Sequence, residues 1–170
     1  MYLLSVKVYD RLVIHPDAAR PDLAATLHPL AQALIEAELP VLTAHGLSMW
    51  GYVVLSALDD GPVRTQAALA DQVSADKTRI ITTLDRLQTS GLISREPDPR
   101  DRRVRLLSIT PAGRTVRASA QAEIQANEEH LLALLSPADR SGFLRALRAF
   151  AALSRDEMNK ALRPGTQHRA

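Results

Sequence analysis

Apolar residues recur every three or four positions along most of the chain, which predicts a mainly helical fold. After residues 1–21, which we interpret as an N-terminal extension of uncertain order, the first apolar stripe consists of Leu23, Leu27, Leu30 and Leu34. Pro29 is expected to kink this helix or mark its start, and Pro40 to end or bend it. A second helix is predicted over residues 48–59, because Asp-Asp-Gly-Pro at 59–62 is typical of a closing turn.

Two short helices follow, predicted over residues 65–72 and 76–89 and joined by a tight turn. This arrangement is typical of a helix-turn-helix motif. Residues 92–95 and 103–109 then have the pattern of two strands, and the segment between them is rich in proline and aspartate. The pattern therefore predicts a β-hairpin directly after the second helix of the motif.

Two longer helices are expected to complete the chain. Thr110 followed by Pro111 is a start signal, since threonine caps a helix and proline suits its first position. The helix that begins there should reach about Leu135. Ser136 and Pro137 repeat the same signal, and they predict a last helix that reaches about Met158.

The predicted helix over residues 76–89 has one apolar face and one polar face. At about 100° per residue, Ile80, Leu84 and Leu87 fall on the apolar side. The opposite side combines hydroxyls with cations: Lys77, Thr78, Arg79, Thr82 and Arg86. Such a face suits the major groove of DNA, where side chains reach base edges and cations contact phosphates. A merely solvated polar face is the alternative for the helix alone.

The predicted hairpin tip concentrates positive charge. Its cations are Arg100, Arg102, Arg103 and Arg105. Mutual repulsion on so small an element is tolerated best beside a polyanion, and a narrow minor groove attracts inserted arginine. Asp101 lies two residues before Arg103 and is expected to orient its guanidinium, although an aspartate that only forms the turn is the alternative.

Charge is distributed unevenly between this region and the rest of the chain. Residues 76–117 carry ten Lys and Arg against five Asp and Glu, a local balance of +5, whereas the whole chain has a net charge of +2. The remainder is therefore −3. This split favours a nucleic-acid partner, although a GC-rich genome would also enrich arginine. The chain contains no cysteine, which excludes disulfides and thiol chemistry.

These motifs together resemble the MarR (multiple antibiotic resistance regulator) family of winged helix-turn-helix transcriptional regulators. Residues 98–114 resemble the family's wing signature, in which Asp, any residue and Arg precede a strand that ends in Leu-Thr. Ile109 stands in place of that leucine. Residues 82–87 and 91–93 resemble the end of the family's recognition helix. The resemblance covers residues 47–114 and extends more weakly to about Leu153.

The resemblance implies a mainly α fold with a small β-wing. A winged helix-turn-helix DNA-binding domain would occupy residues 47–110, and residues 22–46 plus 111–162 would form a helical dimerisation region. The implied function is a homodimeric repressor that binds a pseudo-palindromic operator in double-stranded DNA. A transcriptional activator, a winged-helix module that binds only proteins and a monomeric bundle are the alternatives. The four wing arginines favour DNA over protein.

The family resemblance also implies a small anionic or phenolic effector. The cleft that would hold it is expected near His28, His45, Trp50 and Tyr52, although each of these residues is also compatible with ordinary packing. A metal sensor is disfavoured, because the adjacent residues 128–130 point in diverging directions on a helix. No metal site or cofactor is predicted.

The sequence contains no recognised catalytic motif, neither a Gly-rich phosphate loop nor G-x-S-x-G nor H-E-x-x-H, so no enzyme is predicted. No apolar run approaches the roughly 20 residues of a membrane span. Lys7, Asp10 and Arg11 interrupt the segment that a signal peptide would need. A cytoplasmic protein without a membrane partner is therefore expected.

Overall fold

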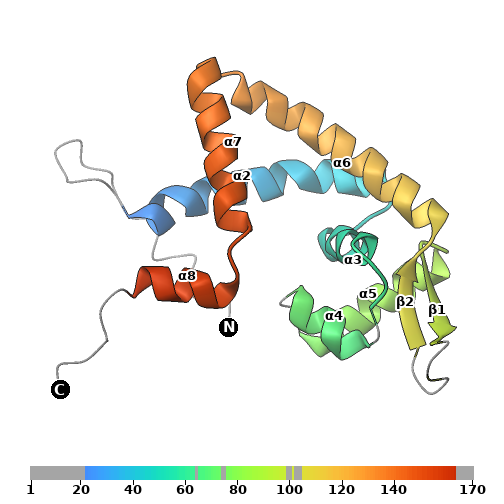
Figure 1. The fold of residues 1–170 in the computed structure, drawn as a ribbon. Coiled ribbons are helices and arrows are strands. Elements are labelled where there is room, and N and C mark those ends of the chain that lie inside the picture. Colours follow the sequence, from blue (N-terminus) through green and yellow to red (C-terminus); the bar gives the residue numbers. More distant parts are fainter. Residues whose placement is uncertain (1–21, 64, 74–75, 99–100, 102–104, 164–170) are drawn as a thin grey trace, which may run out of the picture. The chain divides into compact units, whose positions relative to one another are not determined.

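A computed structural model describes residues 22–63, 65–73, 76–98, 101 and 105–163 (Figure 1). The chain divides into two compact units between Ile124 and Gln125, within helix α6 (Pro111–Leu132). We call them the N-terminal unit and the C-terminal unit. No single helix in the described ranges is long and apolar enough to cross a membrane. The helices Leu23–Ala44 and Met49–Asp59 reach the length and apolar character of a span only when they are taken together, and the chain bends by 85° between them.

Helix α2 (Leu23–Ala44) contains both prolines, so Pro29 does not mark its start and Pro40 does not end it. Proline removes one backbone hydrogen bond, but the residues after it are held by packing: Val41 and Leu42 are buried in the core. The Thr43 hydroxyl also donates to the Leu39 carbonyl at 2.8 Å. The helix therefore continues to Ala44 and ends before Gly46, whose φ of 69° suits glycine.

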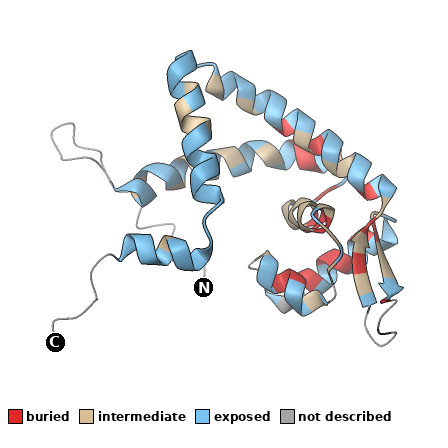
Figure 2. Cartoon of the chain, viewed as in Figure 1, coloured by how far each residue is buried: buried red, intermediate tan, exposed pale blue. Residues whose placement is uncertain are grey.

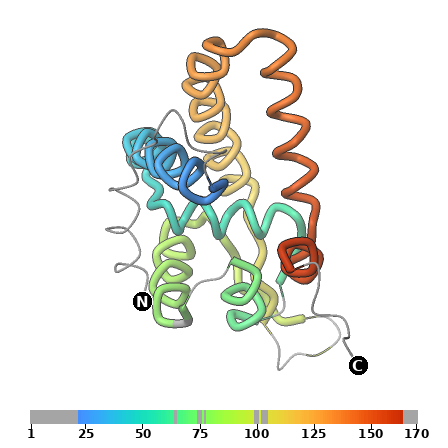
Figure 3. Tube along the Cα trace, turned by 90° about the vertical axis from the view of Figure 1, so that its left-hand side faces the viewer, coloured from blue at the N-terminus to red at the C-terminus, as the bar shows by residue number. Residues whose placement is uncertain are grey.

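The next three helices begin at side-chain caps. They are α3 (Met49–Asp59), α4 (Gln66–Gln72) and α5 (Lys77–Thr89). Ser48 accepts a hydrogen bond from the Gly51 N–H, Thr65 from the Ala68 N–H and Asp76 from the Arg79 N–H. Each cap satisfies a backbone donor that the first turn of a helix leaves free. Helices α4 and α5 lie side by side and α3 runs across them (Figure 3).

The predicted hairpin is an antiparallel pair, β1 (Ile93–Pro97) and β2 (Arg105–Ile109). Ile93 pairs with Ile109, and Pro97 pairs with Arg105. The pairing has one addition that the sequence did not predict. Val63, just after α3, exchanges two backbone hydrogen bonds of 2.8 and 3.0 Å with Leu107. The hairpin is therefore attached to the segment between α3 and α4.

The core of the N-terminal unit is aliphatic and lies where α3, α5 and the strands meet (Figure 2). Its most completely buried large side chains are Leu42, Val54, Leu55, Leu58, Leu69, Ile80, Leu84 and Leu107. The predicted inner face of α5 is confirmed, since Ile80 and Leu84 are 0% exposed and Leu87 is 5% exposed. This burial fixes which face of α5 remains open to solvent.

The C-terminal unit contains the end of α6, α7 (Pro137–Ala151) and α8 (Arg155–Leu162), and neither α7 nor α8 has a buried residue. Helix α6 ends at Leu132 rather than Leu135. The single last helix that we expected is wrong, because Ser154 starts a new helix through a capping box with Glu157. Hydrogen bonds from the hydroxyl and the backbone N–H of Ser154 lower the pKa of Glu157.

Candidate nucleic-acid interface

The open face of α5 carries the side chains predicted to read DNA. Thr78, Arg79, Thr82 and Arg86 are all exposed on it. Lys77 is the first residue of the helix, but its side chain lies outside the described atoms. The buried leucines and isoleucine on the other side hold this polar face outward. Its chemistry of hydroxyls and guanidinium groups suits base edges and phosphates.

Arg79 is the most restrained of these side chains. Its Nε lies 3.4 Å from Oδ2 of Asp76, and its backbone N–H donates to Oδ1 of the same carboxylate at 2.9 Å. Its guanidinium carbon also lies over the ring of Trp50 on α3, 5.3 Å from the ring centroid. The structure therefore brings together a predicted base-reading residue and a predicted effector-cleft residue.

Three threonines of α5, Thr82, Thr83 and Thr89, donate to carbonyls of their own helix and keep acceptor capacity. The Thr82 hydroxyl lies 3.3 Å from the Thr78 carbonyl oxygen, and the buried Thr83 hydroxyl donates to the Arg79 carbonyl at 2.8 Å. A hydroxyl that donates once still has lone pairs for a donor such as an amino group of a base. Thr82 is exposed and can therefore accept from DNA, whereas Thr83 is a structural residue.

Ile81 is a feature of this face that sequence reasoning missed. Its side chain is 45% exposed, although isoleucine usually lies inside. It lies between the buried positions and the polar ones, about 100° from Ile80 around the helix. The helical projection that separated the two faces contained this signal. An exposed apolar group in a major-groove reader fits the methyl group of thymine.

Several cations of the basic region form ion pairs within the protein. Arg95 contacts Asp85 at 2.7 Å, and Arg117 contacts Asp59 at 2.7 Å, while Arg114 also pairs with Asp59. Asp59 lies outside residues 76–117, so the local balance of +5 overstates the free charge there. Arg86 and Arg105, by contrast, have no ion-pair partner within the described ranges.

The wing is described at its base. Arg105 is exposed at the first position of β2. Asp101 is also exposed, and its backbone N–H donates to the carbonyl of the buried Asp98 at 3.2 Å. Arg100, Arg102 and Arg103 lie outside the described residues. The orientation of Arg103 by Asp101 therefore stays a prediction.

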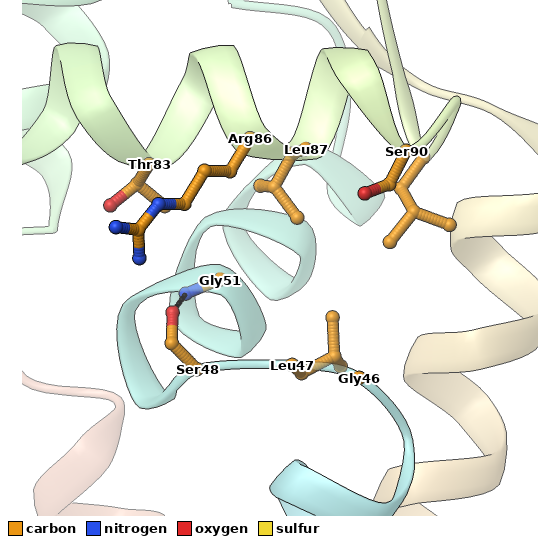
Figure 4. Close-up of a pocket in the computed structure, with 9 residues that line it drawn as sticks. Gly46, Leu47, Ser48, Gly51, Thr83, Arg86, Leu87 and Ser90 are labelled. Carbon is orange, nitrogen blue, oxygen red and sulfur yellow. Dashed lines mark hydrogen bonds between the residues drawn. The ribbon is translucent and has the colours of Figure 1, made fainter.

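The four residues predicted for an effector cleft lie on α2, on α3 and on the loop between these helices. His28 is half-buried on α2, His45 lies 2.9 Å from the Glu123 carboxylate, and Tyr52 packs against the core. A pocket of about 120 Å³ lies between the α2–α3 loop and α5 (Figure 4). None of the four predicted residues lines this pocket. Its lining consists of Gly46, Leu47, Ser48, Gly51, Thr83, Arg86, Leu87, Ser90 and Leu92.

A wider and more open pocket of about 520 Å³ adjoins the same end of α5 and shares Gly46, Arg86 and Ser90 with the first. Neither pocket contains a cluster of metal ligands. Across the described ranges, no group of three or more His, Asp or Glu side chains could hold a metal ion.

Comparison with known proteins shows similarity to transcriptional regulators. The model of the MarR family matches residues 45–104. The transcriptional regulator HosA of Escherichia coli is 32% identical over 111 residues, which cover 65% of this chain and 78% of HosA. A putative transcriptional regulatory protein for the hcr operon of Thauera aromatica is 29% identical over 108 residues. That alignment spans 64% of this chain and 65% of the Thauera protein, just under two thirds.

Solved structures share the fold. The repressor CouR, bound to a 23-mer DNA duplex, superposes with a TM-score of 0.63 at 29% identity, over 76% of this chain and 92% of CouR. A MarR family protein of Mycobacterium tuberculosis in complex with p-aminosalicylic acid gives a TM-score of 0.67 at 23% identity. This superposition covers 78% of this chain and all of that one, 100%. These likenesses agree with the predicted fold, mainly α with a small β-wing.

Proposed function

The chain belongs to the MarR family of transcriptional regulators, and from this premise we propose that it is a homodimeric repressor that binds a pseudo-palindromic DNA operator. The observation that carries the proposal is the open face of α5, which presents hydroxyls and guanidinium groups on a helix anchored by a buried aliphatic face. Similarity to a repressor bound to a DNA duplex supports it. Transcriptional activation is the alternative.

We assign the DNA contacts by chemistry. Thr78, Arg79 and Thr82 would read base edges in the major groove, and Ile81 would contact a thymine methyl group. Lys77 and Arg86 would contact phosphates, since Arg86 has no ion-pair partner within the described ranges. Arg103, oriented by Asp101, would enter the minor groove beside each half-site, and the neighbouring wing cations would bind the backbone: Arg100, Arg102 and Arg105.

Dimerisation is supported by apolar side chains that a single chain leaves exposed. On α2, Leu23 is 55% and Ile35 is 48% exposed. The C-terminal unit adds more of them: Leu131, Leu134, Leu135, Leu147, Phe150, Leu153 and Leu162. So many exposed large apolar groups mark an interaction surface. A two-fold dimer would place its recognition helices about 34–36 Å apart, one turn of DNA.

A small anionic or phenolic effector would lower the affinity for DNA. Similarity to a protein in complex with p-aminosalicylic acid supports this part of the proposal. Residues His28, His45, Trp50 and Tyr52 remain the proposed contacts. No catalytic role is proposed for any residue, and the proposed site of action is the cytoplasm, where an operator would be accessible.

Selection of bound duplexes from a random DNA pool tests the proposal. The expected result is an enriched sequence with two inverted half-sites, and a pool without enrichment would contradict it. On that sequence Arg103→Ala should weaken binding by about 1 to 3 kcal/mol. The matched control is Arg145→Ala on α7, an exposed arginine outside the proposed interface, which should bind as the unchanged protein does.

A further inference from the structure

Trp50 lies outside the aliphatic core. It is the chain's one tryptophan and the second residue of α3. Core packing was an expectation for this residue, but its ring belongs neither to the buried cluster nor to the partly buried side chains packed against that cluster, such as Met49 and Tyr52. The described contact of the ring is with the Arg79 guanidinium, at 5.3 Å. The ring is therefore available for a task other than filling the interior.

The contact restricts one side chain on the proposed DNA-reading face. Arginine has a long and flexible stem, so a base contact by an unrestrained guanidinium requires ordering it on binding. Asp76 fixes the helix start and lies near the guanidinium, and the indole ring attracts the cation from another element. Arg79 nevertheless stays 54% exposed, so its donors remain accessible.

We propose that Trp50 is a positioning residue for Arg79, and that it orders the guanidinium for a paired contact with a guanine base. The inference rests on the proposed function, because it needs α5 in a major groove. Guanine is the expected base because its O6 and N7 acceptors match the two parallel donors of arginine. Trp50 itself touches no base.

The test is a double-mutant cycle on the duplex that the unchanged protein selects. Dissociation constants are measured for that duplex and for versions in which each guanine of the half-site is replaced, in turn, by 7-deazaguanine. Arg79→Ala should lose the preference at one guanine; the range of about 5- to 150-fold for a good paired contact is its upper limit, because 7-deazaguanine lacks N7 but keeps O6. Trp50→Leu, which keeps an apolar side chain but removes the aromatic face, should lose part of the same preference.

The double variant Trp50→Leu/Arg79→Ala should discriminate no less than Arg79→Ala alone, because Trp50 acts through Arg79. Trp50→Phe, which retains an aromatic face, should restore part of the preference. The slope of affinity against salt should be equal in Trp50→Leu and the unchanged protein, since no phosphate contact is lost. A general loss of folding would lower binding to every duplex alike, and the ratio between duplexes would not change.

Fluorescence supplies a readout that needs no DNA. Arg79→Ala should change the emission of Trp50 in the free protein, whereas Arg145→Ala should not. If the unchanged protein selects no sequence, the proposed function and this inference both fail. If it selects a sequence and Trp50→Leu keeps the full guanine preference, or if the two substitutions act additively, this inference alone is overturned.

Discussion

At the residue scale, the role of an arginine in the basic region depends on whether an acidic side chain pairs with it. Arg114 and Arg117 share Asp59, so they tie the start of α6 to the end of α3. Arg95 pairs with Asp85 and links β1 to α5. These three cations link elements of the N-terminal unit through ion pairs, so they are less available to bind a polyanion. Arg86 and Arg105 lack ion-pair partners within the described ranges, so they are better placed to bind phosphate.

Ile81 gives the residue-scale prediction. On the selected duplex, replacing one thymine by deoxyuridine removes a single methyl group and should weaken binding by the unchanged protein about three- to fourfold, since a buried methyl or methylene is worth about 0.8 kcal/mol. Ile81→Ala should bind the two duplexes equally. Competition binding with paired duplexes measures the ratio.

Thr78→Val is the matched control, because it changes a neighbouring exposed side chain that is polar. This variant should retain the sensitivity to deoxyuridine. If Ile81→Ala keeps the full sensitivity, the isoleucine does not contact the thymine methyl group, and its exposure has no part in recognition.

At the element scale, local signals were enough wherever a helix starts at its own side-chain cap. The helix starts predicted near residues 48, 65 and 76 agree with the structure, where Ser48, Thr65 and Asp76 each accept a hydrogen bond from a backbone N–H three residues further on. The pattern of buried and exposed positions on α5 also depends only on residues within that helix. The polar face of the candidate site was therefore largely predictable.

Features that depend on distant partners could not be predicted. The helix continues past Pro40 because the following residues are buried in a core formed by other elements. Val63 pairs with Leu107 across 44 positions of sequence, and the contact between Trp50 and Arg79 joins two helices. The break before α8 is different. Ser154 and Glu157 have the spacing of a capping box, which signals a helix start. Because apolar residues continue on both sides of it, we predicted one continuous helix there.

The junction of the wing with α6 gives the element-scale prediction. A Cβ atom on Gly113 would collide with the carbonyl oxygen of Leu92 and lie 2.9 Å from Cγ1 of Ile109. The backbone cannot yield there, because the same carbonyl accepts the Thr110 N–H at 3.0 Å. Gly113→Ala should lower the free energy of unfolding by about 3 kcal/mol, the upper range for overpacking. Urea denaturation measures this change.

The control for Gly113 is Gly142→Ala on α7. The nearest atom to its added Cβ is the end of the flexible Arg145 side chain, at 3.9 Å. Alanine favours helix over glycine, so this variant should be more stable than the unchanged protein, by about 0.5 to 1 kcal/mol. If Gly113→Ala were as stable as Gly142→Ala, Gly113 would not be closely packed.

At the scale of the whole molecule, the two units differ in how much apolar surface they bury. The N-terminal unit has an aliphatic core of its own, whereas α7 and α8 have no buried residue in the isolated chain. Helices in water are stabilised mainly by burial of an apolar face. The C-terminal unit therefore leaves apolar residues such as Phe150 uncovered, and the proposed dimer would supply a surface to cover them.

Dimerisation gives the whole-molecule prediction. Sedimentation of the unchanged protein should give about 37 kDa, twice the 18.6 kDa of one chain. The double variant Leu147→Glu/Phe150→Glu replaces side chains that are 42% and 56% exposed in one chain. Burying two carboxylates in an apolar interface is strongly unfavourable, so this variant should sediment as a monomer at micromolar concentration.

The same variant separates association from folding. The core of the N-terminal unit contains no residue of α7, so the double variant should keep the amide spectrum of that unit while losing affinity for a two-half-site operator. Arg145→Glu adds an acid on another face of α7 and should remain a dimer. A double variant that still sediments at 37 kDa would exclude this part of α7 from the interface, and a monomeric unchanged protein would contradict dimerisation altogether. Because each half-site alone binds one recognition helix, monomers should also lose the dependence of affinity on half-site spacing.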